Sequence, residues 1–165
     1  MRRKIFILLA IVWMAVIFYF SARAGEDSSE DSSRVAALIL RVVNPDYRTL
    51  PPEEQRKMLE TISHPVRKAA HASEYAVLAG LLLGALLPAP LIRDSGDEKK
   101  SAVTYALTAW AGTVLYAVTD EIHQYFVPDR ACSFTDVCID GAGALCGVLL
   151  AMIFVRYHMN RYRAS

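Results

Sequence analysis

The sequence predicts an all-α membrane protein, built as a compact bundle of four transmembrane helices with a long outer loop that contains short surface helices. Two observations predict this class. Of the 165 residues, 54% are hydrophobic, and the mean hydropathy of +0.26 is high for a soluble chain of this size. The apolar residues are also concentrated in four segments, each near the length that crosses the roughly 30 Å hydrocarbon core at about 1.5 Å per residue. Only a helix satisfies its own backbone in lipid.

The expected spans are residues 5–22, 66–88, 102–122 and 136–156, within one domain that covers residues 1–165. The first segment has a second interpretation, because Ala22-Arg23-Ala24 after an apolar run resembles the cleavage site of a secretory signal. Its length and the aromatic residues 18–20 favour a span with an interfacial aromatic belt.

The segment between the first two spans is expected to lie outside the bilayer core. After the acidic, serine-rich residues 25–33, the apolar run 34–43 is too short to cross and is expected on the membrane surface or on the outer helix ends. Pro51-Pro52 is expected to open a second short helix. The second span is then expected to begin at Ser63-His64-Pro65.

Small residues predict close packing between the spans. Gly143 and Gly147 have the G-x-x-x-G spacing that lets helix backbones approach each other. A bridge between Cys132 and Cys138 is conceivable in an oxidising compartment, although unpaired packing residues are favoured. The spacing of the cysteines does not resemble a zinc site.

Basic residues indicate the orientation of the chain. Clusters lie before the first span, at residues 93–100, and after the fourth span, at residues 156–163. The positive-inside rule predicts a multi-pass membrane protein with both termini in the cytoplasm. The net charge of +1 gives no indication of a nucleic-acid partner.

Three polar residues recur at every third position near the start of the second span. Lys68, His71 and Glu74 therefore share one helical face, which Tyr75 continues. In the simpler interpretation they belong to a helix end whose charges extend to water. That interpretation suits Lys68 better than Glu74, because an ionisable residue this deep in an apolar run usually faces the bundle interior and pairs.

The third and fourth spans add further polar residues at the same end of the bundle. Asp120, His123 and Gln124 share a face if the third helix continues past residue 119. Asp136 and Asp140 lie one turn apart at the start of the fourth helix, where Asp136 also suits the helix dipole. Under the predicted orientation all of these groups lie at the extracytoplasmic face.

Together these motifs resemble the VanZ family nearly end to end. They are Ser21-x-Arg23, Lys68-x-x-His71-x-x-Glu74-Tyr75, and Asp120-Glu121-x-His123-Gln124-x-Phe126-x-Pro128-x-Arg130, followed by Asp136 and Gly143. The sequence departs from the family pattern at Asp140, where asparagine is favoured, and at Asp129, where glycine is favoured. The resemblance implies a small multi-spanning protein of the bacterial cell envelope, in a family with members linked to teicoplanin resistance.

The first functional hypothesis is a protein that binds or alters an envelope component and so lowers susceptibility to teicoplanin-type lipoglycopeptides. Its partners would be membrane lipids and a lipid-linked cell-wall precursor or a lipoglycopeptide. Arginine and lysine would bind a phosphate or carboxylate, while acids and histidines orient them or bind amines. The candidate binding residues are Arg23, Lys68, Tyr75, Gln124 and Arg130.

The alternative hypothesis is a membrane-embedded hydrolase or transferase that acts on a lipid or cell-wall precursor head group. The candidate catalytic residues are His71, Glu74, Asp120, His123 and Asp136. A divalent metal ion could activate water there, with the candidate ligands His71, Glu74, Asp120, His123, Asp136 and Asp140. Acid–base chemistry between Glu74 and His123 is the version without metal. A proton or solute path is disfavoured because the polar groups gather at one face.

Overall fold

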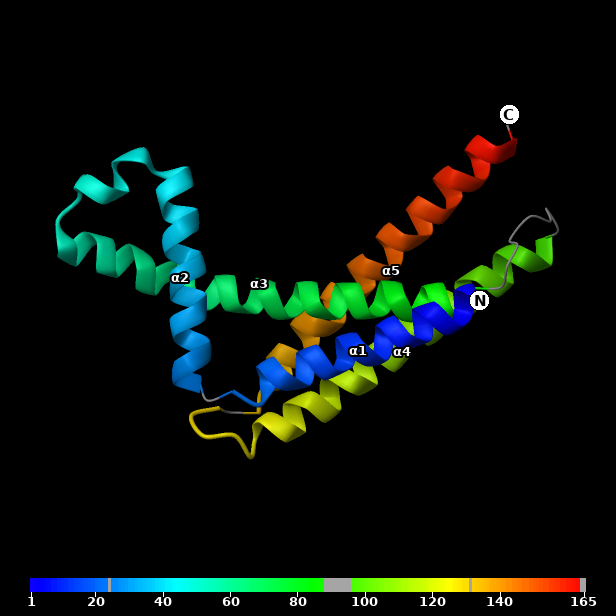
Figure 1. Cartoon of the computed structure of the whole chain (residues 1–165), viewed down its shortest axis with the longest axis horizontal. Helices are drawn as coiled ribbons and strands as arrows, with labels where there is room; N and C mark the ends of the chain where they lie inside the picture. The colour runs from blue at the N-terminus through cyan, green and yellow to red at the C-terminus, as the bar shows by residue number, and fades with distance from the viewer. Residues whose placement is uncertain (24, 88–95, 131, 164–165) are drawn as a thin grey trace.

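The computed structural model describes residues 1–23, 25–87, 96–130 and 132–163, and every regular element in them is helical (Figure 1). The elements are α1 Arg2–Ser21, α2 Gly25–Val43, the 3-10 helix η1 Pro45–Thr49, α3 Pro52–Leu86, α4 Gly96–Gln124 and α5 Phe134–Arg163. The predicted all-α class is therefore confirmed. The prolines and Arg93 of the loop expected after Leu87 lie outside the described residues, whereas Lys99 and Lys100 fall within α4.

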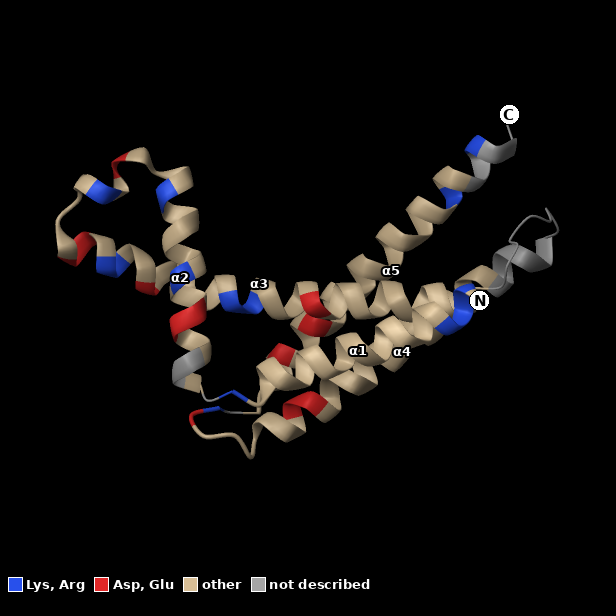
Figure 2. Ribbon diagram, viewed as in Figure 1, with Lys and Arg blue, Asp and Glu red and all other residues tan. Residues whose placement is uncertain are grey.

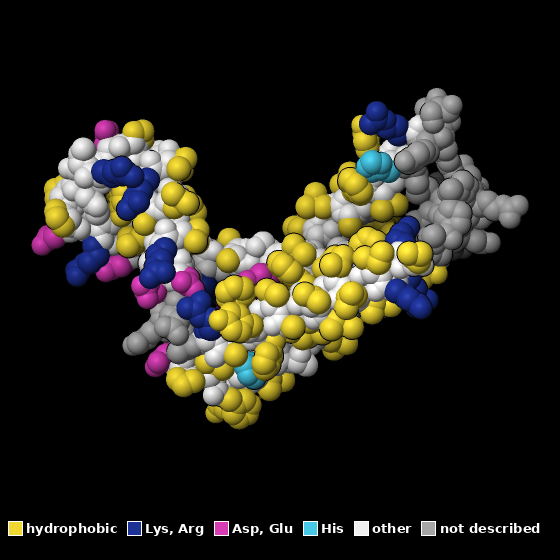
Figure 3. Space-filling view, viewed as in Figure 1, with side chains coloured by type: hydrophobic (Ala, Val, Ile, Leu, Met, Phe, Trp, Pro, Cys, Tyr) yellow, Lys and Arg dark blue, Asp and Glu magenta, His cyan; other side chains and the backbone are white. Residues whose placement is uncertain are grey.

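Four of these helices are long and apolar enough to cross a membrane. They are α1, α3, residues Ala102–Gln124 of α4, and residues Phe134–His158 of α5. Large hydrophobic side chains are exposed along their outer sides (Figure 3). Such surfaces are unfavourable in water and are suited to contact with lipid. The chain is a multi-pass membrane protein with four candidate spans.

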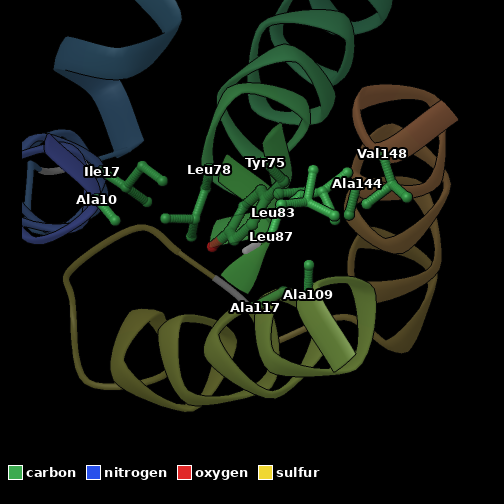
Figure 4. Close-up of a cluster of buried hydrophobic side chains, with 11 residues drawn as sticks. Ala10, Ile17, Tyr75, Leu78, Leu83, Leu87, Ala109, Ala117, Ala144 and Val148 are labelled. Atoms are coloured by element: carbon green, nitrogen blue, oxygen red, sulfur yellow. The ribbon is translucent and has the colours of Figure 1, made fainter. Parts of the chain in front are cut away.

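Helix α3 lies at the centre of the bundle. Tyr75, Leu78 and Leu83 of α3 are fully buried, and they point into the space between α1, α4 and α5 (Figure 4). The other three helices supply mostly small or branched side chains to this cluster, such as Ala109 of α4 and Val148 of α5. Helix α3 is therefore in contact with each of the other three spans.

Two glycines of α5 bring its backbone against α3. A Cβ atom on Gly143 would lie 2.1 Å from the carbonyl oxygen of Ala72, and one on Gly147 would lie 2.0 Å from that of Ala76. No side chain fits at such distances, so the expected close approach is found, at the G-x-x-x-G pair. We call these four residues the glycine seam.

Helix α1 is an integral part of the bundle. Trp13 Nε1 donates to the Glu74 carbonyl of α3 at 2.9 Å, and Tyr116 Oη of α4 donates to the Met14 carbonyl at 2.7 Å. Arg2 Nη2 donates to the Leu87 carbonyl just beyond α3 at 3.3 Å, near the last carbonyls of that helix, which have no helical partner. These contacts favour the interpretation of this segment as a span over that of a cleaved signal.

The segment between α1 and the α3 span differs from the prediction in two ways. Helix α2 begins at Gly25 rather than near residue 34, and α3 is one helix from Pro52 to Leu86. The expected separate short helix after Pro52, and a helix that begins at Ser63-His64-Pro65, are therefore wrong.

Packing between α2 and α3 explains both differences. Ala36 and Leu40 of α2 are buried, and Ser33 Oγ lies 3.3 Å from Ser63 Oγ of α3. These contacts together contribute against the cost of Pro65 inside α3, which is roughly 3 kcal/mol for an interior proline. Serines before residue 34 lie within the helix with hydroxyls bonded back one turn, as Ser32 Oγ donates to the Ser28 carbonyl at 2.7 Å.

The three cysteines, Cys132, Cys138 and Cys146, are free and exposed. The conceivable Cys132–Cys138 bridge is therefore not formed in this structure, and exposure does not suit the packing role that was expected for them.

Candidate functional site

Charged side chains gather at the end of the bundle beside α2. Figure 2 shows acidic and basic residues around this end and basic residues at the opposite end, near the N-terminus. The charged residues beside α2 surround a cavity of about 240 Å³, which we call the polar cavity. Its lining comes from α3, α4, α5 and the loop between α4 and α5. The lining residues are His64, Arg67, Lys68, His71, Glu121, Gln124, Asp129, Arg130, Ser133, Asp136, Ile139 and Asp140.

An ion pair joins α3 to α5 at the polar cavity. Lys68 Nζ lies 2.6 Å from Asp136 Oδ1. Asp136 stands in the first turn of α5, where its carboxylate also complements the helix dipole. Both side chains are about a third exposed, so the pair is worth at most roughly 1 kcal/mol. Its main effect is to hold two walls of the cavity in register.

His71 and Glu74 form the second charged contact on the same face of α3. His71 Nδ1 lies 3.5 Å from Glu74 Oε2. His71 lines the polar cavity, whereas Glu74 does not. Glu74 Oε2 is buried and has no hydrogen-bond partner among the described residues. The two residues, which share the predicted helical face, are therefore in contact at a loose distance.

A chain of hydrogen bonds runs from the core to the cavity. Tyr75 Oη and Gln124 Nε2 each donate to Asp120 Oδ2 at 3.0 Å. Arg130 Nη1 donates to Gln124 Oε1 at 3.1 Å, and Nη2 donates to the Phe20 carbonyl of α1 at 3.3 Å. This chain fixes the position of Arg130 from two sides.

Tyr75 and Asp120 belong to the interior end of this chain. Tyr75 has no exposed surface and Asp120 is buried, and both are absent from the cavity lining. Tyr75 is predicted to bind the ligand and Asp120 to act in catalysis. The structure instead places them where they position Gln124 and Arg130.

Two arginines face the polar cavity without a carboxylate partner. Within the described part of the chain, neither Arg67 nor Arg130 forms an ion pair. The Nε atom of each is buried and has no hydrogen-bond partner there. Burial, followed by the positive charge of Arg67, lowers the pKa of Arg130, while the nearby acids Asp120, Glu121 and Glu74 act in the opposite direction. Both guanidinium groups belong to the lining of the same cavity. We call them the arginine pair.

Two acids complete the polar cavity. Glu121 and Asp140 are both buried residues that line it, and Glu121 Oε2 has no hydrogen-bond partner among the described residues. A buried polar atom without a partner costs roughly 1–3 kcal/mol. The cavity therefore presents unpaired groups of both signs.

His123 and Arg23 lie outside the polar cavity. The His123 ring packs against Phe18 of α1, with centroids 4.5 Å apart. This places it away from the other candidate catalytic residues that line the cavity. Arg23 forms an ion pair with Asp31 of α2.

The structure does not bring the predicted metal ligands together. Among the described residues, no three side chains of His, Cys, Asp or Glu are placed to hold one ion. The six candidates separate instead into the Lys68–Asp136 and His71–Glu74 contacts, the buried Asp120, the Phe18-packed His123 and the cavity-lining Asp140. The residues present do not fit a metal centre, and we derive no step through one.

Sequence reasoning did not identify His64 and Arg67, which both line the polar cavity. With His71 they follow the spacing i, i+3 and i+7, which places them on one helical face. That signal requires a helix that continues through Pro65. The expectation that the helix begins there is what concealed these residues.

A second cavity, of about 180 Å³, lies between the end of α1, the first half of α2 and α3. We call it the α2 cavity. It shares Arg67 and His71 with the polar cavity. Its lining residues are Phe20, Arg23, Ser28, Asp31, Ser32, Val35, Val66, Arg67, Ala70, His71 and Glu74.

Comparison with known proteins gives one family match. The model of the family described as VanZ/LLP1 matches residues 6–155, which include most of the first and fourth candidate spans, the whole of the second and third, and every residue that lines the two cavities. No curated protein and no solved structure matches the chain.

Proposed function

The chain belongs to the VanZ/LLP1 family of membrane proteins, and from that premise we propose that its polar cavity binds an anionic group of a cell-envelope component. The observation that carries the proposal is the arginine pair. Two guanidinium groups line one cavity, and the buried Nε atom of each has no hydrogen-bond partner among the described residues. A phosphate or carboxylate between them would accept hydrogen bonds from both, a geometry for which guanidinium is well suited.

The size of the cavity limits the ligand to a small group. Its volume of about 240 Å³ falls below the roughly 300–1,000 Å³ of pockets that enclose drug-sized molecules. A head group or a peptide terminus fits this volume, whereas a whole glycopeptide does not. The rest of such a ligand would lie outside the cavity.

The two buried acids indicate a further property of the ligand. Glu121 and Asp140 line the same cavity as the arginine pair. A ligand that carries an amine beside its anion would pair with both sets of groups. A zwitterionic or aminoacylated head group has this chemistry.

The same proposal includes the orientation and the physiological role. The basic clusters at residues 2–4, 93–100 and 156–163 support cytoplasmic termini, which places the polar cavity at the extracytoplasmic face of the bacterial membrane. A protein that binds an envelope component there would reduce what is accessible to a teicoplanin-type lipoglycopeptide. Lowered teicoplanin susceptibility follows from the proposal as its cellular consequence.

The test compares Arg67→Gln with Arg56→Gln in protein reconstituted into zwitterionic nanodiscs. Arg56 is an exposed arginine of the same helix and serves as the matched control. Binding of glycerol phosphate and of labelled teicoplanin is measured for each. We expect Arg67→Gln to weaken binding of glycerol phosphate about tenfold or more, equal to about 1.4 kcal/mol. Equal binding by the two variants would contradict the proposal.

The His71–Glu74 contact favours a second candidate function, an acid–base hydrolase or transferase. His71 faces the cavity and Glu74 lies beside its Nδ1 atom, 3.5 Å away, which is the arrangement of a base and the group that orients it. Mass spectrometry of phospholipids incubated with the same samples decides this. Products that disappear with His71→Gln would establish the enzyme, and their absence would leave the binding function.

A further inference from the structure

The α2 cavity adjoins the polar cavity and has a partly apolar lining. Arg67 and His71 line both cavities. Beyond these two residues, part of the α2 cavity lining is apolar and comes from three helices. These residues are Phe20, Val35, Val66 and Ala70. A ligand that reaches the arginine pair with its anionic group can therefore extend an apolar portion into the α2 cavity.

Helix α2 carries an exposed apolar stripe that begins at this cavity. Val35, which lines the cavity, is followed by Ile39 and Val42 at the spacing i, i+4 and i+7, so all three share one helical face. Their exposed fractions are 50%, 40% and 75%. A separate face of α2, with Ala36 and Leu40, is buried. We call Val35, Ile39 and Val42 the α2 stripe.

The placement of α2 indicates what contacts this stripe. The helix runs across the polar end of the bundle, whereas the four spans run along it (Figure 1). Figure 3 shows hydrophobic side chains on the side of α2 that is turned toward the spans. A helix in this position lies at the boundary between head groups and acyl chains, where an apolar face meets hydrocarbon.

We propose that the ligand of the polar cavity is an anionic membrane lipid that is held in both cavities. Its phosphate lies between Arg67 and Arg130. Its first chain segments pass Arg67 and His71 into the α2 cavity, and the chain then follows the α2 stripe into the bilayer. This inference rests on the proposed anion binding and adds that the anion belongs to a lipid. The acyl chain stays out of water throughout, so the head group enters the protein without exposing the acyl chain to water.

The experiment uses phosphatidylglycerol with a photoactivatable group near the start of one acyl chain. The full chain is reconstituted in nanodiscs of phosphatidylcholine that contain a small fraction of this probe. After illumination, the labelled residues are mapped by mass spectrometry. We expect labels on Val35, Ile39 and Val66. Excess unlabelled phosphatidylglycerol should remove them, and phosphatidylcholine of the same chain length should not.

Two variants assign the labelling to the proposed path. Arg67→Gln should reduce the labels on α2 about tenfold, while Arg56→Gln should leave them unchanged. Val35→Trp would fill the α2 cavity and should also abolish the labels, with Val103→Trp on the exposed side of α4 as the control. Retained binding of glycerol phosphate by Val35→Trp shows that this variant is folded.

The outcomes separate this inference from the proposed function. Labels only on the outer sides of the spans, unaffected by Arg67→Gln, would overturn the lipid path. If glycerol phosphate still binds in an Arg67-dependent manner, the anion site would stand without a lipid chain. If neither the labels on α2 nor Arg67-dependent binding of glycerol phosphate is observed, the inference and the proposed function are both overturned.

Discussion

Helices α3 and α5 form two contacts of opposite character within a few turns of each other. At the glycine seam the backbones touch, with space for no side chain at Gly143 or Gly147. One turn earlier on α5, Asp140 faces a cavity that His71 of α3 also lines. The comparison shows that small residues determine where the backbones of the two helices touch, and thereby where a cavity lies between them. Close packing and the proposed binding site thus occupy adjacent parts of one helix pair.

The energetics of the two regions explain why they occur together. The polar cavity contains several buried atoms without hydrogen-bond partners among the described residues, each of which costs roughly 1–3 kcal/mol. The seam gains close van der Waals contact along two turns. The packing of the seam offsets the cost of holding the cavity in an unpaired state.

The largest effect is expected from Gly147→Ala. The added Cβ would lie 2.0 Å from the carbonyl oxygen of Ala76, and backbone cannot rotate away as a side chain can. Overpacking of this kind costs about 1–3 kcal/mol, and occasionally more. Thermal unfolding in detergent, followed by circular dichroism, measures the change.

Gly80→Ala is the matched control, because no atom outside its own helix lies within 4 Å of its added Cβ. It should leave the midpoint unchanged or raise it slightly, since alanine is favoured over glycine in helices. Similar midpoints for the two variants would show that the helices do not touch at the seam.

An intermediate effect is expected from Tyr75→Phe. It removes one of the two donors to Asp120 Oδ2 in a fully buried position. Because Gln124 still donates to that oxygen, the cost in the free energy of unfolding is roughly 0.5–1.5 kcal/mol. Tyr157→Phe, at an exposed position on α5, should have no effect. Equilibrium unfolding in detergent provides the comparison. A Tyr75→Phe protein as stable as the parent would remove Tyr75 from the hydrogen-bonded chain that positions Arg130.

The smallest effect, of opposite sign, is expected from Asp129→Gly. Asp129 has a φ of 58°, in the left-handed region that disfavours side chains. Glycine relieves this strain but loses more entropy on folding, so we expect a net gain of about 0.5 kcal/mol. Asp46→Gly, in η1, should destabilise the protein instead. Asp46 does not have a positive φ that glycine could relieve, so the substitution adds only the entropic cost of glycine. A loss of stability in Asp129→Gly, seen in the same melting experiment, would assign the Asp129 carboxylate a structural role at the polar cavity.

Hydropathy and helical periodicity predicted the bundle and part of the polar end. Lys68 and Asp136, placed on two different helices, are in contact in the structure, and Tyr75 contacts Asp120. Both contacts follow from the predicted faces, because charged and polar groups in apolar helices turn inward toward each other. Their participation in binding remains a prediction.

The features that were not predicted depend on tertiary packing. Pro65 appeared to start a helix because proline usually does, yet contact with α2 keeps α3 continuous around it. That single difference concealed Arg67. The ring of His123 packs on Phe18, and no pattern in the α4 sequence indicates that α1 supplies this neighbour. Contacts between helices far apart in the sequence are decided by their rotation about their axes, which periodicity does not fix.

The hydrogen bond from Arg130 to the Phe20 carbonyl joins residues that are separated by 110 positions. During synthesis, α1 enters the membrane long before Arg130 exists. Its hydropathy of 2.3 is the highest of the four spans, while that of α4 is only 1.2. The first span is thus able to remain in lipid alone, whereas α4 reaches the bilayer when α1 and α3 are already there to accept it. Assembly of the cavity is consequently a late event in biogenesis, completed only after the α4–α5 loop has been made.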